Sequence, residues 1–338
     1  MKKYKYVRFA IILILAIFFA SILFDVMGIG GGKEAIDFKI AEGYGTNAIA
    51  DGLKRAGIIN NKTIFKIYAR ITGEHIYQKG THTLNASMSF GEIIDELETI
   101  PTEWMHTVLI PEGYELQQIA NTLESEGLIN REVFMREAEV GDFGYSFLET
   151  IAGRENRLEG YLYPDTYIFT ENMSEYEIID TMLANFERIV IPVYEQSQSE
   201  RSLDEIIKLA SIIEREAAND DERALVASVF VNRLNKGMRL ESCATVQYLL
   251  RERKSVLSNE DTQIDSPYNT YKNIGLPIGP IASPGLKSIE AALYPDVTNY
   301  LYFMASDDGS YSLFAETFEE HSDNQKKSEL NLENENDR

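Results

Sequence analysis

An internal repeat constrains the fold of this 338-residue chain more than any other feature. The segment Phe38-Lys-Ile-Ala-Glu-Gly-Tyr44 recurs as Val108-Leu-Ile-Pro-Glu-Gly-Tyr114, and Gly57-Ile-Ile-Asn60 recurs in the same register as Gly127-Leu-Ile-Asn130. Each copy predicts a short strand, a Glu-Gly turn and an amphipathic helix that a glycine ends. Two copies are too few for a solenoid, which needs several stacked repeats. The repeat therefore predicts two related small βα modules.

The first copy continues through Lys79-Gly-Thr-His-Thr83 to Met88-Ser-Phe-Gly-Glu-Ile-Ile-Asp-Glu-Leu97. This strand, turn and helix pattern resembles the LysM-type modules that bind polymers of N-acetylglucosamine. The resemblance implies a LysM-like module over residues 34–100. A spacer that holds the following domain away from a membrane is the alternative, and the two roles are compatible.

The N-terminus predicts export. Four basic residues within positions 2–8 precede an uninterrupted apolar run from Phe9 to Phe24, which flanking residues extend to roughly membrane-spanning length. Basic residues before such a run place the N-terminus in the cytoplasm and the rest of the chain outside. We expect residues 1–33 to form a cytoplasmic stub and a single transmembrane helix. A cleaved signal peptide is the alternative, although no small-x-small cleavage site follows the run.

Charge and composition exclude several classes of function. The formal net charge of −22 argues against nucleic acid as a partner, because binding phosphates requires an excess of Lys and Arg. Cys243 is the only cysteine, so no disulfide forms within the chain, and the four histidines lack metal-ligand spacing. No glycine-rich phosphate loop is present, and we expect neither a metal nor a cofactor. Residues 322–338 are polar, acidic and free of aromatics, which predicts a disordered tail.

One glutamate is a candidate general acid. Ser202, followed three residues later by a glutamate, predicts a helix start. From there, Leu209, Ile212 and Ile213 lie on the same helical face as Glu216. A carboxyl group on an apolar face is costly to ionise and tends to hold its proton near neutral pH, as a general acid requires. Glu214 points about 160° away by the helical period and is not expected to take part.

A structural role for Glu216 is the alternative. On pattern alone, it is a glutamate at the edge of a helix that forms an ion pair with Arg215 or Arg223.

Short blocks rich in Tyr, Pro, Gly and Asn follow from about Pro101 onward. They include residues 159–167, 228–240, 245–248, 266–271 and 275–280. In this order the blocks resemble the YceG-like family of endolytic murein transglycosylases, over nearly the whole chain. That family's catalytic glutamate is the second of a Glu-x-Glu pair in a helix of the type Ala-Ser-Ile-Ile-Glu-x-Glu, and it corresponds to Glu216.

The resemblance implies an α+β protein whose catalytic domain spans residues 101–321. Its expected reaction is cleavage of the β-1,4 bond between N-acetylmuramic acid and N-acetylglucosamine in nascent peptidoglycan, with formation of a 1,6-anhydro sugar. The expected partners are peptidoglycan glycan strands and the membrane, with peptidoglycan synthases as candidate protein partners. A long helix that carries Glu216 should lie beside a β-rich groove formed by the later blocks.

Several polar and aromatic residues are candidates for sugar binding. Tyrosines offer flat apolar faces with a polar tip, amides and hydroxyls both donate and accept hydrogen bonds, and glycine lets the backbone approach the substrate. The candidate substrate-binding residues are Asp165, Thr245, Gln247, Tyr248, Asn269, Tyr271 and Gly279.

Two departures from the family pattern leave alternatives open. Cys243-Ala244-Thr245-Val246 stands where the family has Asp-Pro-Thr-Val, and Ser312 stands at the place of a histidine. These changes support a weakly active or non-catalytic scaffold that binds peptidoglycan. A hydrolysing muramidase is the other alternative, with Glu159 or Asp165 as the second carboxylate.

Overall fold

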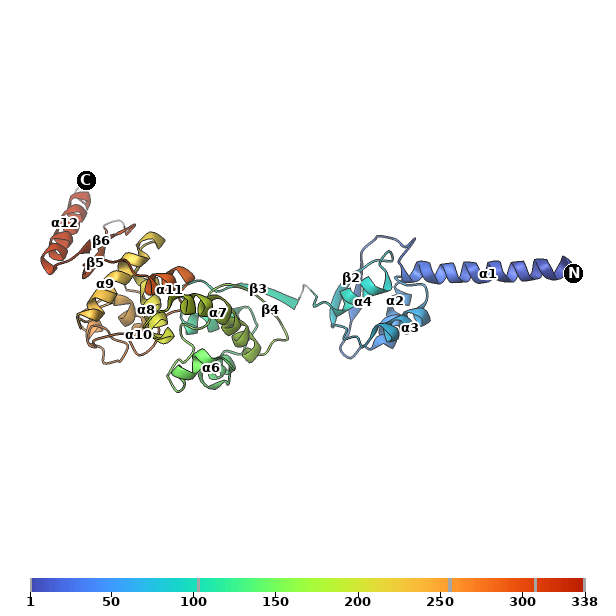
Figure 1. The fold of residues 1–338 in the computed structure, drawn as a ribbon, viewed down its shortest axis with the longest axis horizontal. Coiled ribbons are helices and arrows are strands. Elements are labelled where there is room, and N and C mark those ends of the chain that lie inside the picture. The colour runs from blue at the N-terminus through green and yellow to red at the C-terminus, as the bar shows by residue number, and fades with distance from the viewer. Residues whose placement is uncertain (1, 102–103, 255–256, 307–308, 337–338) are drawn as a thin grey trace. The chain divides into compact units, whose positions relative to one another are not determined.

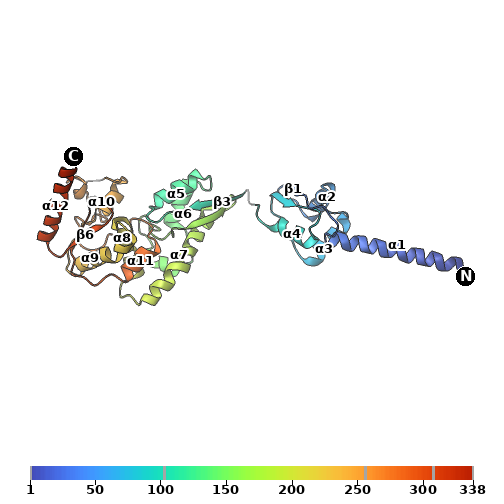
Figure 2. The ribbon, with the colours of Figure 1, turned by 90° about the horizontal axis from the view of Figure 1, so that it is seen from above.

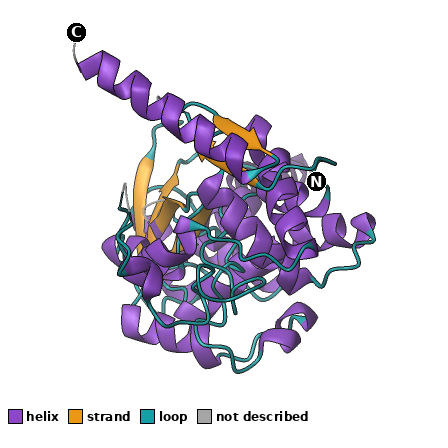
Figure 3. Ribbon diagram, turned by 90° about the vertical axis from the view of Figure 1, so that its left-hand side faces the viewer, coloured by secondary structure: helices purple, strands orange, loops and turns teal. Residues whose placement is uncertain are grey.

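The computed structural model describes residues 2–101, 104–254, 257–306 and 309–336, and it is a mixed α+β fold, as predicted. Helices make up most of the described chain and the strands are short (Figure 3). The chain divides into two units, residues 1–106 and 107–338. Figure 1 shows both units, with labels on many of their elements.

The first unit contains one two-stranded antiparallel sheet, in which Phe38 lies opposite His82. Phe38, Leu53, Phe65 and Phe90 form part of its own hydrophobic core. Its elements are α1 (Lys2–Val26), β1 (Ile36–Ile40), α2 (Thr46–Arg55), α3 (Lys62–Thr72), β2 (Gly80–Leu84) and α4 (Phe90–Glu98).

Helix α1 covers the apolar run, and its large side chains from Phe9 to Phe24 are mostly exposed. At its end, the Asp25 carboxylate accepts hydrogen bonds from the backbone N–H groups of Asn60 (2.8 Å) and Asn61 (2.7 Å), which attaches the helix to the module. Within the described residues, no helix meets the length and apolarity of a membrane span. The membrane anchor therefore stays a prediction.

The second unit carries the candidate site. Its strands pair as two separate ladders, β3 with β4 and β5 with β6. The elements up to the Glu216 helix are β3 (Met105–Leu109), α5 (Leu116–Ser125), α6 (Arg131–Val140), η2 (Ser146–Ile151), β4 (Thr166–Thr170), α7 (Glu175–Ser197) and α8 (Leu203–Glu216). The later elements are η3 (Asp220–Glu222), α9 (Arg223–Asn235), α10 (Cys243–Leu250), η4 (Asp261–Gln263), α11 (Leu286–Leu293), β5 (Tyr302–Ala305), β6 (Ser312–Ala315) and α12 (Phe318–Asn336).

The repeat produces the two predicted βα modules. Strand, helix and second helix follow one another as β1, α2 and α3 in one copy and as β3, α5 and α6 in the other; α5 and α6 lie beside each other in Figure 2. The Glu-Gly turns place Gly43 at φ +80° and Gly113 at φ +76°, a backbone conformation that favours glycine. The strand partners differ, because β1 pairs with β2 whereas β3 pairs with β4.

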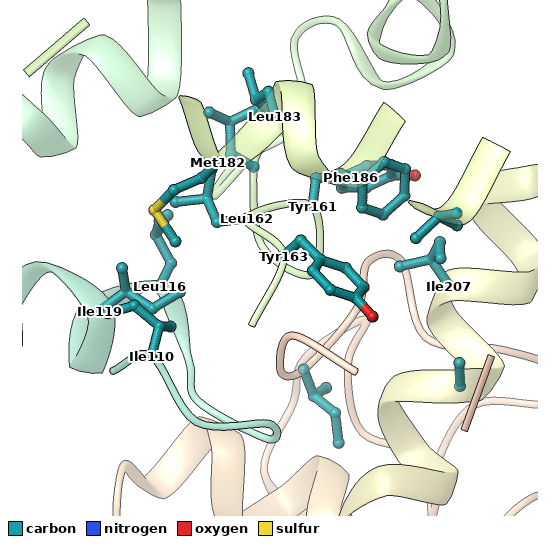
Figure 4. Close-up of a cluster of buried hydrophobic side chains, with 14 of the residues drawn as sticks. Ile110, Leu116, Ile119, Tyr161, Leu162, Tyr163, Met182, Leu183, Phe186 and Ile207 are labelled. Carbon is teal, nitrogen blue, oxygen red and sulfur yellow. The ribbon is translucent and has the colours of Figure 1, made fainter. Parts of the chain in front are cut away.

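A large apolar core holds α8 in the second unit. Helix α8 packs against α11 and α9, and its residues Leu209, Ile212 and Ile213 are fully buried. Part of the same core appears in Figure 4, where Tyr161 lies near Phe186 of α7 with ring centroids 5.2 Å apart. The apolar helical face predicted from the sequence, which contains Leu209, Ile212 and Ile213, is therefore the buried face of α8.

The disordered tail predicted for residues 322–338 stays a prediction. Residues 322–336 continue α12, which begins at Phe318. His321 stacks on Tyr302 of β5 with ring centroids 5.3 Å apart and contacts Gln325 one turn later, and Lys326 pairs with Asp323. Composition could not predict the contact of His321 with Tyr302, because Tyr302 lies on a strand earlier in the chain.

Candidate active site

Glu216 is the last residue of α8, and the start of that helix fixes its orientation. The Ser202 hydroxyl accepts from the backbone N–H of Glu205, and the Glu205 carboxylate accepts from the backbone N–H of Ser202, which is the predicted reciprocal cap. From this cap, α8 runs to Glu216 through residues whose apolar side chains are buried. The side chain of Glu216 itself is half-buried.

One oxygen of Glu216 is held and the other is available. Oε1 accepts hydrogen bonds from the Ser242 hydroxyl at 2.5 Å and from the backbone N–H of Ala244 at 3.0 Å. Among the described residues, Oε2 has no hydrogen-bond partner. The side chain is therefore fixed through one atom, and its second oxygen is free to meet a ligand.

Neither arginine proposed as an ion-pair partner contacts Glu216. Arg215 pairs with Glu115 at 3.2 Å, and Arg223 pairs with Glu214 at 3.1 Å. Glu214 also accepts from the backbone N–H of Gly285 at 3.0 Å, so it connects α8 to the start of α11. The ion-pair alternative for Glu216 is thus wrong in its stated partners, and the structural role belongs to Glu214.

Glu216 lines a cavity of about 650 Å³. Its walls come from the ends of α8 and α10, from β5 and β6, and from α12, elements that lie together in Figures 1 and 2. The expected β-rich groove is present in part, since β5 and β6 form one wall while residues 243–250 are helical. Polar and aromatic groups around the cavity include Arg233, Glu241, Cys243, Tyr271, Tyr302 and Ser312.

A buried threonine pair supports the residue that holds Glu216. Thr270 Oγ1 accepts from the backbone N–H of Ser242 at 3.1 Å, and the Thr245 hydroxyl donates to the Ser242 carbonyl at 2.8 Å. The two threonine hydroxyls lie 2.9 Å apart and are buried. Thr245 was predicted to bind substrate, and the structure places it behind Ser242.

Arg233 ties together three parts of the cavity wall. Its guanidinium donates to the Leu301 carbonyl (2.6 Å), to the Leu240 carbonyl (2.9 Å) and to the Glu241 carboxylate (3.2 Å), and it lies over the Tyr302 ring. Arg233 is only 7% exposed. Arg233, Glu241 and Ser242 are site residues that the sequence does not predict, since no local pattern connects them to Glu216.

The positions that depart from the family pattern line this cavity or contact Glu216. The Cys243 thiol is 3.0 Å from the Tyr271 hydroxyl. Cys243 is exposed at the mouth of the cavity, where partial desolvation by the surrounding wall and the charge of Glu216 raise the pKa of its thiol, and the bond to Tyr271 opposes the rise. Ala244 gives Glu216 a backbone N–H that a proline at this position would lack. Ser312 also lines the cavity.

Only one of the seven predicted substrate-binding residues, Tyr271, lines the Glu216 cavity among the residues that the structure describes. Asn269 is fully buried and donates to the carbonyls of Thr262 and Ile264, which shapes the loop before Tyr271. Asp165 accepts from Asn185 at 2.9 Å near the start of β4. Their roles toward substrate stay predictions.

The remaining three lie at other cavities or close to them. Tyr248 lines a second cavity of about 660 Å³, and Gln247 lines a third of about 320 Å³. Gly279 approaches Tyr268, which also lines the second cavity.

Glu159 is a second buried carboxyl group. It accepts from the backbone N–H of Leu116 at 2.9 Å and from the Tyr248 hydroxyl at 3.1 Å, and it is 1% exposed. Burial raises its pKa to about 8, although the Leu116 N–H opposes the rise. Neither Glu159 nor Asp165 lines the Glu216 cavity, whose other carboxylate is Glu241.

The fold and the site together define a class: an α+β protein with one half-buried helical glutamate at a cavity, held through a single oxygen. The sequence model of the YceG-like family matches residues 38–327, and the chain belongs to this family. The endolytic murein transglycosylase of Bacillus subtilis strain 168 is 34% identical over 301 residues, which cover 86% of this chain and 83% of the relative.

Two further relatives extend the comparison. The endolytic murein transglycosylase of Streptococcus pneumoniae strain D39 is 33% identical, and the match covers 86% of this chain and 58% of that protein. The crystal structure of a yceG-like protein from Listeria monocytogenes has a TM-score of 0.57 and 33% identity, over 86% of this chain and 99% of that one.

Proposed function

We propose that this protein is an endolytic lytic transglycosylase that cleaves the β-1,4 bond between N-acetylmuramic acid and N-acetylglucosamine in peptidoglycan. The observation that carries the proposal is the state of Glu216, with Oε1 held by two donors and Oε2 unengaged at a cavity. The names of the relatives from Bacillus and Streptococcus support the same activity.

In the proposed reaction, Glu216 acts first as an acid. Because Oε1 already accepts two hydrogen bonds, the proton of the neutral acid resides on Oε2. Oε2–H protonates the glycosidic oxygen while the bond from that oxygen to C1 of the muramyl sugar breaks. The N-acetylglucosamine leaves as an alcohol, and positive charge develops at C1.

Glu216 then acts as a base. The C6 hydroxyl of the same muramyl sugar attacks C1 and gives its proton to the carboxylate, so the 1,6-anhydro product forms without water and the neutral acid returns. An intramolecular nucleophile reacts at a high effective concentration, which can lower the barrier by about 7–11 kcal/mol. Acid and base assistance from a placed carboxyl group contributes roughly 10²–10⁴-fold.

A single variant tests the activity. Glu216→Gln keeps the shape of the side chain but removes the acidic proton, so we expect it to lose cleavage of peptidoglycan strands. Mass spectrometry of the wild-type digest should find 1,6-anhydro ends. Reducing ends in their place would identify a hydrolysing muramidase. Equal cleavage by wild type and Glu216→Gln would remove Glu216 from the mechanism.

A non-catalytic scaffold is the second candidate function. Of the positions that differ from the family pattern, Cys243 and Ser312 line the Glu216 cavity and Ala244 donates to Glu216, which is the observation in its favour. A scaffold binds glycan strands and peptidoglycan synthases without cutting. An inactive wild type that retains glycan strands, with a Glu216→Gln strain that grows normally, would establish this function instead.

The protein's proposed location is the cytoplasmic membrane. Basic residues precede the apolar run of α1, whose side chains from Phe9 to Phe24 are mostly exposed, and this supports an N-terminal anchor with the second unit outside the cytoplasm. Cys243 is the only cysteine and is exposed. A membrane-impermeant thiol reagent should therefore label it in protoplasts. Labelling only after lysis would contradict this orientation.

The first unit has a proposed role of its own. Its strand, two helices and second strand support a LysM-like glycan-binding module, or a spacer. A glycan pull-down that compares the full chain with one lacking residues 34–100 distinguishes the two.

A further inference from the structure

A cavity at the far end of α10 is lined by an excess of arginines. Its volume is about 320 Å³, and its charged residues are Arg131, Arg215, Arg251 and Arg253 with Glu115 and Glu252, a net charge of +2. The whole chain has a formal net charge of −22. We infer that this cavity binds the carboxylates of the peptide stem carried by the muramyl sugar, an inference that rests on the proposed function.

Two of these arginines are available for a ligand. Arg215 is occupied by Glu115 at 3.2 Å, and Arg131 donates to the side chains of Gln117 and Asn121. Arg251 and Arg253 are exposed and take part in no ion pair among the described residues. A guanidinium binds a carboxylate through two parallel hydrogen bonds, which makes both arginines suited to an acidic peptide.

The amide side chains of the cavity also present donors. Gln117 and Asn121 use their oxygens to accept from Arg131, and Gln118 uses its oxygen to accept from the backbone N–H of Glu115. Their NH₂ groups have no partner among the described residues. Donors of this kind suit the carbonyl groups of a peptide as well as carboxylates.

The position of the cavity relative to Glu216 suits a stem peptide. Ala244, near the start of α10, donates to Glu216, whereas Arg251 directly follows the last residue of that helix. Seven residues of helix span about 10 Å. The separation along α10 is therefore one that a few extended peptide residues can span, and Arg215 lies beside Glu216 in the sequence.

The test measures binding without cleavage. The full chain with Glu216→Gln is titrated with glycan strands that carry stem peptides and with the same strands after an amidase has removed the stems. We expect the strands with stems to bind about tenfold more tightly or better, in line with one or two hydrogen bonds to charged groups. Raising the salt concentration should reduce this difference, because the arginines are exposed.

Two matched variants assign the effect to the cavity. Arg251→Ala with Arg253→Ala should abolish the preference for stems and leave binding to bare strands unchanged. Arg136→Ala with Arg239→Ala removes the same charge from exposed residues that line none of the described cavities, and it should keep the preference. Equal thermal unfolding temperatures would show that both double variants are folded.

Three outcomes would overturn the inference: equal binding of both kinds of strand, a stem preference that survives in Arg251→Ala with Arg253→Ala, or competition by inorganic pyrophosphate with none by free stem peptide. The last outcome would make the cavity a phosphate site. Failure of the proposed function is a separate result, since it appears as wild-type protein that forms no anhydro ends while binding is measured independently.

Discussion

Ser242 holds Glu216 through a hydroxyl rather than through a charge. Its Oγ lies 2.5 Å from Glu216 Oε1, and its own backbone is fixed by Thr270 and Thr245. A neutral donor places no charge beside the carboxyl group, whereas an arginine partner would favour the ionised state of a carboxyl group. The residue thus suits an acid that must become a base.

Ser242→Ala should therefore slow the reaction more than it weakens binding. Loss of one hydrogen bond to a carboxylate costs about 1.5–3 kcal/mol, which corresponds to a fall in kcat of roughly 10–100-fold with KM little changed. Ser242→Thr keeps the hydroxyl and should restore most of the rate. Steady-state kinetics on glycan strands decide the matter, and an unchanged kcat in Ser242→Ala would exclude this positioning role.

Glu159 makes the stability of the second unit depend on pH. Burial raises its pKa to about 8, from an ordinary value of 4.5. Between these values the folded state binds a proton that the unfolded state releases, so the free energy of unfolding falls as pH rises toward 8 and stays low above it.

Because glutamine cannot ionise, the free energy of unfolding of Glu159→Gln should not show this fall as the pH rises. The free energy of unfolding of Glu159→Gln minus that of wild type should be larger at pH 9 than at pH 5 by a few kcal/mol. Each unit of pKa shift contributes about 1.4 kcal/mol, which sets the upper bound. Urea unfolding at pH 5, 7 and 9 measures the difference. Parallel pH profiles for the two proteins would contradict the raised pKa.

At the scale of elements, Arg233 of α9 joins the strands of the cavity wall to the rest of the unit. It donates to the backbone carbonyls of Leu301, Arg239 and Leu240, which lie outside regular secondary structure. A buried carbonyl that loses its donor keeps the cost of its lost hydration.

Arg233→Ala should consequently lower the free energy of unfolding by about 3 kcal/mol. Arg233→Lys should recover only part of this loss, because an ammonium group cannot reach the three carbonyls with the planar fork of a guanidinium. Chemical denaturation of the three proteins gives the comparison, and full recovery by lysine would show that charge alone matters.

The elements that sequence could predict are those that local interactions decide. The cap at Ser202 and the spacing of Leu209, Ile212 and Ile213 are short-range signals, and α8 follows them. The contact of Ser242 with Glu216 spans 26 positions, and the stacking of His321 on Tyr302 joins a helix to an earlier strand. These contacts depend on tertiary packing, which is why the sequence could not predict the cavity wall.

At the scale of the whole molecule, the two units have separate hydrophobic cores, and the residues that form the Glu216 cavity all belong to the second unit. Folding stability in a domain comes mainly from its own buried core. Nothing in the contacts of Glu216 requires the apolar helix α1 or the repeat copy in residues 38–60.

Residues 104–338 alone should therefore fold and cleave. This fragment keeps β3, which pairs with β4, and we expect a single cooperative unfolding transition and a kcat on soluble glycan strands within about threefold of the full chain, because every group that touches Glu216 is retained. Its retention on insoluble peptidoglycan should drop, since the proposed LysM-like module is absent. A fragment that folds cooperatively yet fails to cut soluble strands would show that the first unit takes part in the reaction. The N-terminal part of the chain would then do more than position the second unit.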